Sequence, residues 1–177
     1  RIKPHWTFDG QPGLQTGQPV KFQPGRGSES YTCVATPVLL EDRVYMVFSH
    51  DPWMGKKISQ IVCFDARGEG DITPTAQIWA QPLERESLAS PAIDLDARRM
   101  YLTDNGGNVY CLDIDSGEKY WSQELGGSIW GSTLLADDKI FIGTNRRRLW
   151  ILRPGKQFDV ISEIETNDQI YNSAIAA

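Results

Sequence analysis

A four-part pattern of short apolar runs recurs along most of the chain, and it restricts the fold more than any other feature. Runs of four to seven apolar or β-branched residues alternate with turn-forming residues, at the spacing typical of β-sheet proteins. The first run of the pattern begins near Thr36, Ser90, Ser132 and Ser173, with spacings of 54, 42 and 41 residues. No window of about 11 residues keeps helical periodicity, so we expect almost no helix.

Three further runs follow the first one in the same order. The second run covers 43–47, 99–103 and 139–143; the third covers 61–65, 109–113 and 149–153; the fourth covers 77–80, 119–122 and 159–162, and residues 5–8 fit it too. Four short strands in a unit of about 40 residues indicate a β-propeller blade. A β-sandwich with chance similarity is the alternative, and the shared order of the runs argues against it.

The sequence therefore predicts an all-β fold, a partial β-propeller of four-stranded antiparallel blades with about three blades plus flanking strands. Residues 1–30 are expected to form a strand and a Gly/Pro-rich loop. Residues 31–177 hold the repeats, with blades at about 33–82, 88–125 and 130–166 and the start of the next at 172–177. Because propellers close with about four to eight blades, we expect a fragment of a larger propeller, or two copies that associate to complete the ring.

The stretch 111–121 is the best-preserved copy of the link between the third and fourth runs. Asp113, Ser116 and Gly117 have turn chemistry, and Trp121 brings a large apolar ring into the next strand. Asp113 and Asp115 also raise the question of a calcium loop. An EF-hand needs an oxygen ligand at its fifth position, where Gly117 stands, so a strand-linking turn is the better interpretation.

This stretch resembles the repeat of the pyrroloquinoline-quinone-like (PQQ-like) β-propeller family, Ala-x-Asp-x-x-Thr-Gly-x-x-x-Trp. Asp113, Ser116 in place of Thr, Gly117 and Trp121 match it, with Cys111 in place of Ala. The resemblance implies that the Trp of one blade docks against its neighbour. The first blade keeps Asp65 and Trp79 around an insertion, whereas the third has Arg153 for Asp and Ile161 or Ser162 near the Trp position.

The family contains enzymes of the quinoprotein alcohol dehydrogenase-like type and cofactor-free scaffolds of the BamB type. The enzymes carry an adjacent Cys-Cys pair, a calcium ion and an Asp base, but Cys33, Cys63 and Cys111 are not neighbours. We assign no catalytic, cofactor-binding or metal-binding residue, and expect PQQ and calcium only if the chain is part of a dehydrogenase. The resemblance favours a non-catalytic scaffold of the bacterial envelope or periplasm. A dehydrogenase fragment and a small-molecule sensor remain the alternatives.

Residues that depart from the repeat are the candidates for partner binding. Trp53 and Met54 lie in the insertion 49–60, either to bind a partner or to fold back over the blade; a second insertion covers 68–76. Arg146, Arg147 and Arg148 form a hairpin tip that either grips an acidic partner or is simply solvated. The net charge of -5 argues against nucleic acid, and no apolar run approaches 18 residues, which predicts no membrane-spanning helix.

Overall fold

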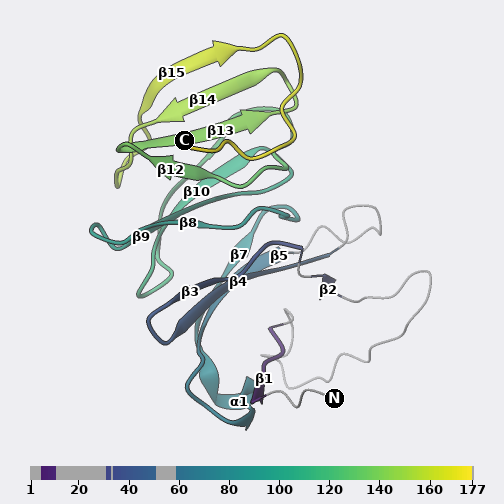
Figure 1. The fold of residues 1–177 in the computed structure, drawn as a ribbon, viewed down its shortest axis with the longest axis vertical. Helices are drawn as coiled ribbons and strands as arrows, with labels where there is room; N and C mark the ends of the chain where they lie inside the picture. The colour runs from purple at the N-terminus through teal and green to yellow at the C-terminus, as the bar shows by residue number, and fades with distance from the viewer. Residues whose placement is uncertain (1–4, 11–30, 33, 51–58, 177) are drawn as a thin grey trace, which may run out of the picture.

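Three antiparallel sheets follow one another along the molecule. The computed structural model describes residues 5–10, 31–32, 34–50 and 59–176. The sheets are stacked along the long axis, with the first near the N-terminus and the third near the C-terminus (Figure 1). The prediction of an all-β partial propeller with four-stranded antiparallel blades is confirmed, and the described sheets do not close into a barrel.

Blades 2 and 3 are simple four-stranded meanders. Their strands pair in chain order, as antiparallel neighbours. Blade 2 comprises β8 (Ala92–Asp94), β9 (Arg99–Thr103), β10 (Asn108–Asp113) and β11 (Lys119–Glu124). Blade 3 comprises β12 (Leu134–Ala136), β13 (Lys139–Thr144), β14 (Arg148–Leu152) and β15 (Val160–Glu165).

Blade 1 has the same core with additions at both ends. It comprises β2 (Tyr31–Thr32), β3 (Val38–Leu40), β4 (Arg43–His50), β5 (Ser59–Asp65) and β7 (Gln77–Leu83). Both β2 and β3 pair with the long strand β4. The insertion between β5 and β7 forms β6 (Gly70–Asp71) and the one-turn helix α1 (Thr73–Ala76), and β6 pairs in parallel with β1 (Trp6–Thr7).

One irregularity repeats at the same place in every blade. The register shifts after Cys63, after Cys111 and after Ile151, where the third strand of each blade meets the fourth. The bulge places Trp79 opposite Cys63 and Trp121 opposite Cys111, whereas Ser162 stands opposite Ile151. A β-bulge bends the strand and turns its side chains, so the shared bulge gives all three blades the same twist at this point.

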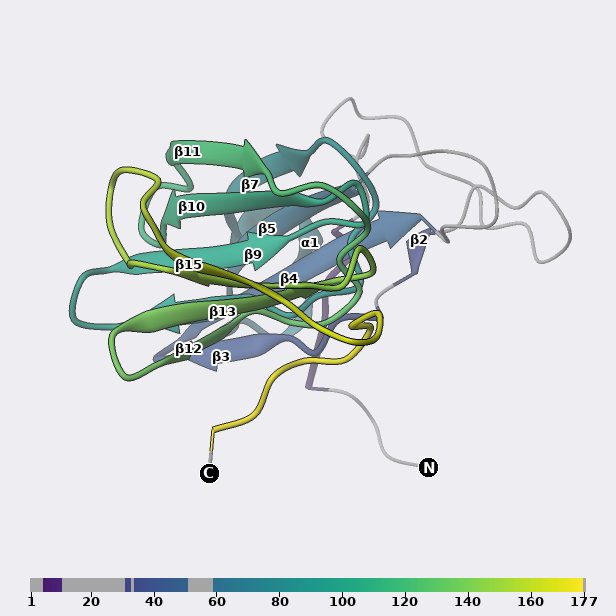
Figure 2. The same cartoon turned by 90° about the horizontal axis from the view of Figure 1, so that it is seen from above.

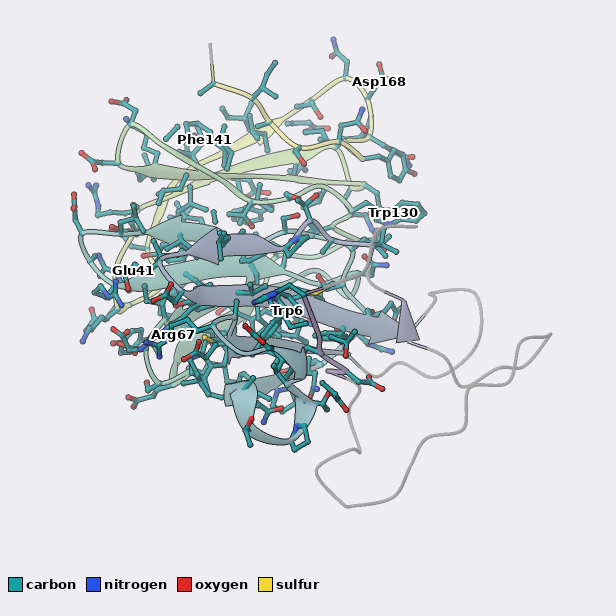
Figure 3. All side chains as sticks on the ribbon, turned by 60° about the horizontal axis from the view of Figure 1, so that its bottom comes forward. Trp6, Glu41, Arg67, Trp130, Phe141 and Asp168 are labelled. Carbon is teal, nitrogen blue, oxygen red and sulfur yellow. The ribbon has the colours of Figure 1, made fainter. Side chains whose placement is uncertain are left out.

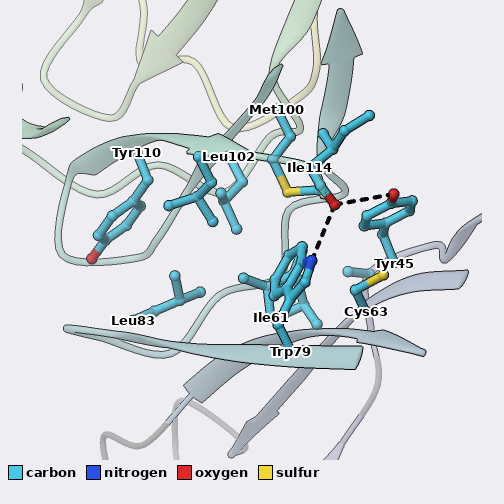
Figure 4. Close-up of a cluster of buried hydrophobic side chains, with 12 residues drawn as sticks. Tyr45, Ile61, Cys63, Trp79, Leu83, Met100, Leu102, Tyr110 and Ile114 are labelled. Atoms are coloured by element: carbon cyan, nitrogen blue, oxygen red, sulfur yellow. Dashed lines mark hydrogen bonds between the residues drawn. The ribbon is translucent and has the colours of Figure 1, made fainter. Parts of the chain in front are cut away.

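The tryptophans on the fourth strands dock against the following blade. In the first interface, Trp79 Nε1 and the Tyr45 hydroxyl both donate to the carbonyl of Ile114, at 3.0 and 3.3 Å (Figure 4). In the second interface, Trp121 Nε1 donates to the carbonyl of Gly155 at 3.0 Å. Each ring thus covers apolar surface while its N–H satisfies a backbone acceptor in the neighbouring turn.

The space between blades 1 and 2 holds the largest buried cluster. Its members come from both sheets: Ala35, Tyr45, Val47, Ile61, Cys63, Trp79 and Leu83 from blade 1, and Met100, Leu102, Tyr110, Leu112 and Ile114 from blade 2. The next cluster repeats this arrangement between blades 2 and 3, with Tyr101, Cys111 and Trp121 in the places of Tyr45, Cys63 and Trp79. Two of the three apolar clusters among the described residues therefore lie between blades, whereas the third lies on the other face of blade 1, where Phe8, Ile72 and Ala76 pack against its strands.

A chain of serine hydroxyls links the first strands of successive blades. The N–H of Thr36 donates to Ser90 Oγ at 2.9 Å, the N–H of Ser90 to Ser132 Oγ at 2.9 Å, and the N–H of Ser132 to Ser173 Oγ at 2.7 Å. The partners are 54, 42 and 41 residues apart, which is the repeat spacing itself. Residues Ser173–Ile175 form no strand of their own, yet Ser173 joins this chain.

Because the indole of Trp79 is docked against the next blade, we predict that truncating this side chain strongly lowers the stability of the fold. Trp79 is 8% exposed, and we expect Trp79→Ala to lower the free energy of unfolding by about 3 to 5 kcal/mol. Trp79→Phe keeps most of the ring and loses the bond to Ile114, so it should cost only about 1 kcal/mol from the hydrogen bond. Ile161, 40% exposed, is the control, and its change to alanine should stay within about 0.5 kcal/mol. Urea unfolding measures all three, and equal losses for Trp79→Ala and Ile161→Ala would contradict the docking role.

Candidate functional site

The turn between β10 and β11 uses its polar atoms to hold itself together. Asp113 Oδ1 accepts the backbone N–H groups of Asp115 and Ser116, both at 2.9 Å, and the Ser116 hydroxyl. Its Oδ2 accepts the hydroxyl of Tyr120 at 2.8 Å. Burial pushes the pKa of Asp113 up, but these hydrogen bonds outweigh it and the pKa is lowered. The carboxylate is occupied by donors of its own turn, which favours a structural role over a cation site.

Gly117 brings this turn against the preceding blade. It adopts φ +74°, and a Cβ at this position would lie 2.6 Å from the ring of Trp79. Glycine is thus required twice, for its left-handed backbone and for the close approach of the indole. Two parts of the sequence motif, the Gly of one blade and the Trp of the blade before it, meet at this point.

The corresponding carboxylate of blade 1 has a different partner. Asp65 pairs with Arg67, whose side-chain hydrogen bond lowers the pKa of Asp65 to about 2.

Asp115 links two blades, because its carboxylate accepts hydrogen bonds from Arg43 of blade 1 at 2.7 Å and from Arg98 of its own blade at 2.6 Å. The hydrogen bond from Arg98 is the main cause of the lowered pKa of Asp115. No sequence pattern indicated this bridge, since Asp115 occupies a variable position of the repeat.

The described cysteines do not form a reactive site. Cys63 and Cys111 are both free and buried, each in a different interblade core. Burial raises the pKa of both thiols to about 11. Among the described residues no group of three or more His, Cys, Asp or Glu side chains could hold a metal ion, and no helix is long and apolar enough to cross a membrane.

The three arginines at 146–148 lie on one long edge of the molecule. This hairpin edge comprises the β9–β10 turn (104–107), the β13–β14 turn (145–147) and the connections 84–91, 125–133 and 166–172 between blades. It lies on the right in Figure 2, where the arrows of β4, β7, β9 and β11 point. In Figure 3, Trp130 and Asp168 lie on this edge, while Glu41 and Arg67 lie on the opposite one.

The three arginines have different surroundings. Arg148 pairs with Glu163 and Glu165, both at 3.0 Å, and Arg147 lies 3.4 Å from Glu165. Arg146 is exposed and makes no ion pair or side-chain hydrogen bond in the described part of the chain. Arg147 adopts φ +60° where blade 2 has Gly107 at +92°, while Arg146 does not have a positive φ. In this turn the positive φ therefore falls on Arg147, where a side chain makes it unfavourable.

An aromatic pair stands on the same edge. Trp130 and Tyr171 are equivalent positions of successive repeats, each two residues before the linking serine. Their rings meet edge to face with centroids 5.5 Å apart, and they are 37% and 44% exposed. The other aromatic candidates, Trp53 and Met54 of the first insertion, lie outside the described residues.

Asp104 organises this edge, and sequence reasoning missed it. It is fully buried at the end of β9 and accepts the N–H groups of Arg85, Gly106 and Asn108 as well as the hydroxyl of Tyr110. Burial, then the bond to Asp104, raises the pKa of Tyr110. An Asp directly before Asn-Gly in a hairpin was the available signal, but nothing in the sequence showed that the carboxylate turns inward.

Comparison with a family model decides the family. The model described as "Outer membrane protein assembly factor BamB", of the PQQ-like repeats, matches residues 57–156. The chain belongs to this family. Comparison with curated protein sequences gives no significant match. The resemblance to PQQ-like propellers stated from the sequence is thereby confirmed.

Solved structures of propeller type share the fold. BamB from Moraxella catarrhalis has a TM-score of 0.61 at 17% identity, and the match covers 80% of this chain and 37% of that one. The computationally designed Ika4 protein has a TM-score of 0.67 at 9% identity, over 100% of this chain and 89% of that one. A europium-containing methanol dehydrogenase has a TM-score of 0.58 at 11% identity, over 90% of this chain and 29% of that one. The chain thus spans well under half of the two natural relatives.

The cysteine environment predicts slow thiol chemistry. In a Cys33→Ser background at pH 8, a pKa of about 11 leaves roughly 100-fold less thiolate than an ordinary thiol has, and burial slows access further. We expect an aromatic disulfide reagent to label Cys63 and Cys111 only after urea unfolds the protein. Rapid labelling of the folded protein would contradict their burial between blades.

The left-handed backbone of Arg147 predicts opposite substitution effects at neighbouring sites. Arg147→Gly and Arg147→Ala both remove the pair with Glu165, but only alanine keeps the cost of positive φ. We expect the glycine variant to be more stable than the alanine variant by about 1 kcal/mol. At Arg146 the order should reverse, with the alanine variant more stable than the glycine variant by about 0.5 to 1 kcal/mol. Glycine at this position only increases the conformational entropy of the unfolded chain. Thermal unfolding of the four variants is the measurement, and the same order at both sites would contradict the backbone assignment.

Proposed function

We propose that the chain is a non-catalytic PQQ-like propeller scaffold of the bacterial cell envelope that binds protein partners through its hairpin edge. The carrying observation is the gathering of exposed Trp130, Tyr171 and unpaired Arg146 on one edge. Trp, Tyr and Arg are the residues most enriched among interface hot spots. The partner is a protein rather than a nucleic acid, because the chain carries a net charge of -5.

Two features of the described part of the chain support leaving quinone and calcium out of this proposal. The two described cysteines are buried in separate interblade cores, with no neighbouring thiol to form an adjacent disulfide. Asp113, a candidate oxygen ligand in the best-preserved repeat, is occupied by hydrogen-bond donors of its own turn. Our proposal therefore includes neither PQQ nor calcium.

Family membership supports the location and the type of partner. The matching family is described as an outer membrane protein assembly factor, and BamB from Moraxella catarrhalis shares the fold. We therefore place this chain in the periplasm or envelope, bound to other proteins of that compartment.

Site-specific photo-crosslinking tests the proposal. A photoreactive residue at Arg147, on the hairpin edge, should give a discrete adduct in cells of the source bacterium, whereas one at exposed Glu118, on the opposite edge, should not. The adduct partner, identified by mass spectrometry and purified, should bind the wild-type protein and bind Trp130→Ala at least about 10-fold more weakly, as expected for a hot spot.

Two outcomes would contradict it. Adducts that form only at Glu118, or at neither position, would exclude the hairpin edge as the interface. A stoichiometric change in quinone absorbance when PQQ and calcium are added to the purified protein would overturn the non-catalytic assignment.

A further inference from the structure

A continuous polar trough runs along the hairpin edge between blades 2 and 3. One depression of about 350 Å³ is lined by the two hairpin turns and by Arg85 and Glu86. A second, of about 610 Å³, lies on the blade 3 side and is lined also by Arg147, Arg148 and Glu163. The two depressions share Gly127, Asn145 and Arg146, so together they form one groove, which we call the hairpin trough.

Two guanidinium groups in this trough make no ion pair with any described residue. Arg85 and Arg146 line the same depression, and in the described part of the chain neither makes an ion pair or a side-chain hydrogen bond. Arg147 and Arg148, their neighbours, are paired with Glu163 and Glu165. The trough therefore offers two free cationic forks, the side chain that best matches a carboxylate.

Two buried acceptors in the same depression also lack partners. Glu86 Oε2 and Asn105 Oδ1 are shielded from solvent and accept no hydrogen bond. The equivalent Asn145 of blade 3 is satisfied, because its Oδ1 accepts the N–H of Ser128 at 2.8 Å. The unsatisfied acceptors are thus a departure of blade 2 from the repeat, and a buried acceptor without a donor costs about 1 to 3 kcal/mol.

The unpaired groups are held in place by close backbone contacts. A Cβ at Gly106 would collide with Cγ of Arg85, and one at Gly127 would collide with Cγ of Arg146, so both arginine stems lie directly on glycine backbone. The Asp104 carboxylate accepts hydrogen bonds from five donors, and one of them is the backbone N–H of Arg85 at 3.1 Å. These bonds fix the turn beneath Arg85. A site whose side chains are already positioned loses little entropy on binding.

We propose that the hairpin trough binds an extended acidic peptide segment of a partner protein. A carboxylate of the segment lies between Arg85 and Arg146, and the backbone of the segment follows the trough. This inference rests on the proposed function and adds the chemistry of the partner. Glu86, Glu124 and Glu163 also line the trough and repel a polyanion, which favours a peptide with few carboxylates over a phosphate-rich ligand.

Direct binding of defined peptides tests this. The probe is a fluorescein-labelled decapeptide of Ser with one central Glu, and its control has Gln in place of that Glu; fluorescence anisotropy is measured with the purified full chain. We expect saturable binding of the acidic probe, at least about 10-fold weaker binding of the Gln control, and weakening as salt increases.

Matched variants locate the binding. Arg85→Gln and Arg146→Gln should each weaken the acidic probe by at least about 10-fold, the loss expected for one charge-assisted pair. Arg153→Gln removes the same charge on the opposite edge, where Arg153 pairs with Asp159, and should leave binding unchanged. Near-ultraviolet circular dichroism checks that the variants keep their packing, and Arg146→Lys should restore part of the affinity.

The outcomes separate this inference from the proposed function. No binding, equal binding of the Gln control, or equal loss in Arg153→Gln would overturn the acidic-peptide site. If adducts at Arg147 still form in that case, the scaffold function stands and only the class of partner segment is wrong. If neither peptide binding nor adducts at Arg147 are found, both proposals are wrong.

Discussion

The contact between an indole and a glycine of the next blade is the constraint on which this structure depends. Trp79 lies on the backbone of Gly117 and donates to the carbonyl of Ile114, so one side chain closes an apolar core and satisfies a turn. Because the two largest cores lie on faces shared by neighbouring blades, a single blade has little to stabilise it alone. The stability of the molecule therefore lies in the contacts between repeats, and the repeat conserves the residues that make them.

A second, polar set of contacts fixes how the blades are spaced. The serine chain joins the first strands at one side of the sheets, and the docked tryptophans join the fourth strands at the other. Two contacts at opposite sides of a sheet define its angle to the next sheet better than either contact alone. The Asp115 bridge to Arg43 adds to the first interface, but it is partly exposed and worth at most about 1 kcal/mol.

The sequence predicted the parts of this fold that repeat, and it missed the contacts that occur at only one place in the fold. Strand positions and the turn at Asp113 follow from alternating apolar residues and turn chemistry, which are local properties. The inward carboxylate of Asp104, the bridge at Asp115 and the meeting of Arg85 with Arg146 each join residues that are far apart in the chain or lie at variable positions. Asp115 meets Arg43, and Arg85 lines a depression with Arg146, only once two parts of the fold lie side by side. The Asp104 contacts lie within one hairpin, but the inward turn of a carboxylate has no local sequence pattern.

The two long edges of the molecule differ in how much the fold depends on their turns. This difference explains on which edge residues for binding can occur. The edge opposite the hairpins holds the turns that receive the docked tryptophans, so Gly117 and the carbonyls of Ile114 and Gly155 are committed to the fold. On the hairpin edge, the turn that holds Gly106 and Gly107 in blade 2 holds Arg146 and Arg147 in blade 3 without loss of the strand register. The price of that exchange is a positive φ at Arg147. Positive φ does not itself distinguish this edge, because Glu41, Arg98, Asp137 and Asp138 in turns of the opposite edge adopt it too. The hairpin edge differs in its arginines without ion pairs in the described part of the chain, Arg85 and Arg146, which line one depression with Glu86 and Asn105.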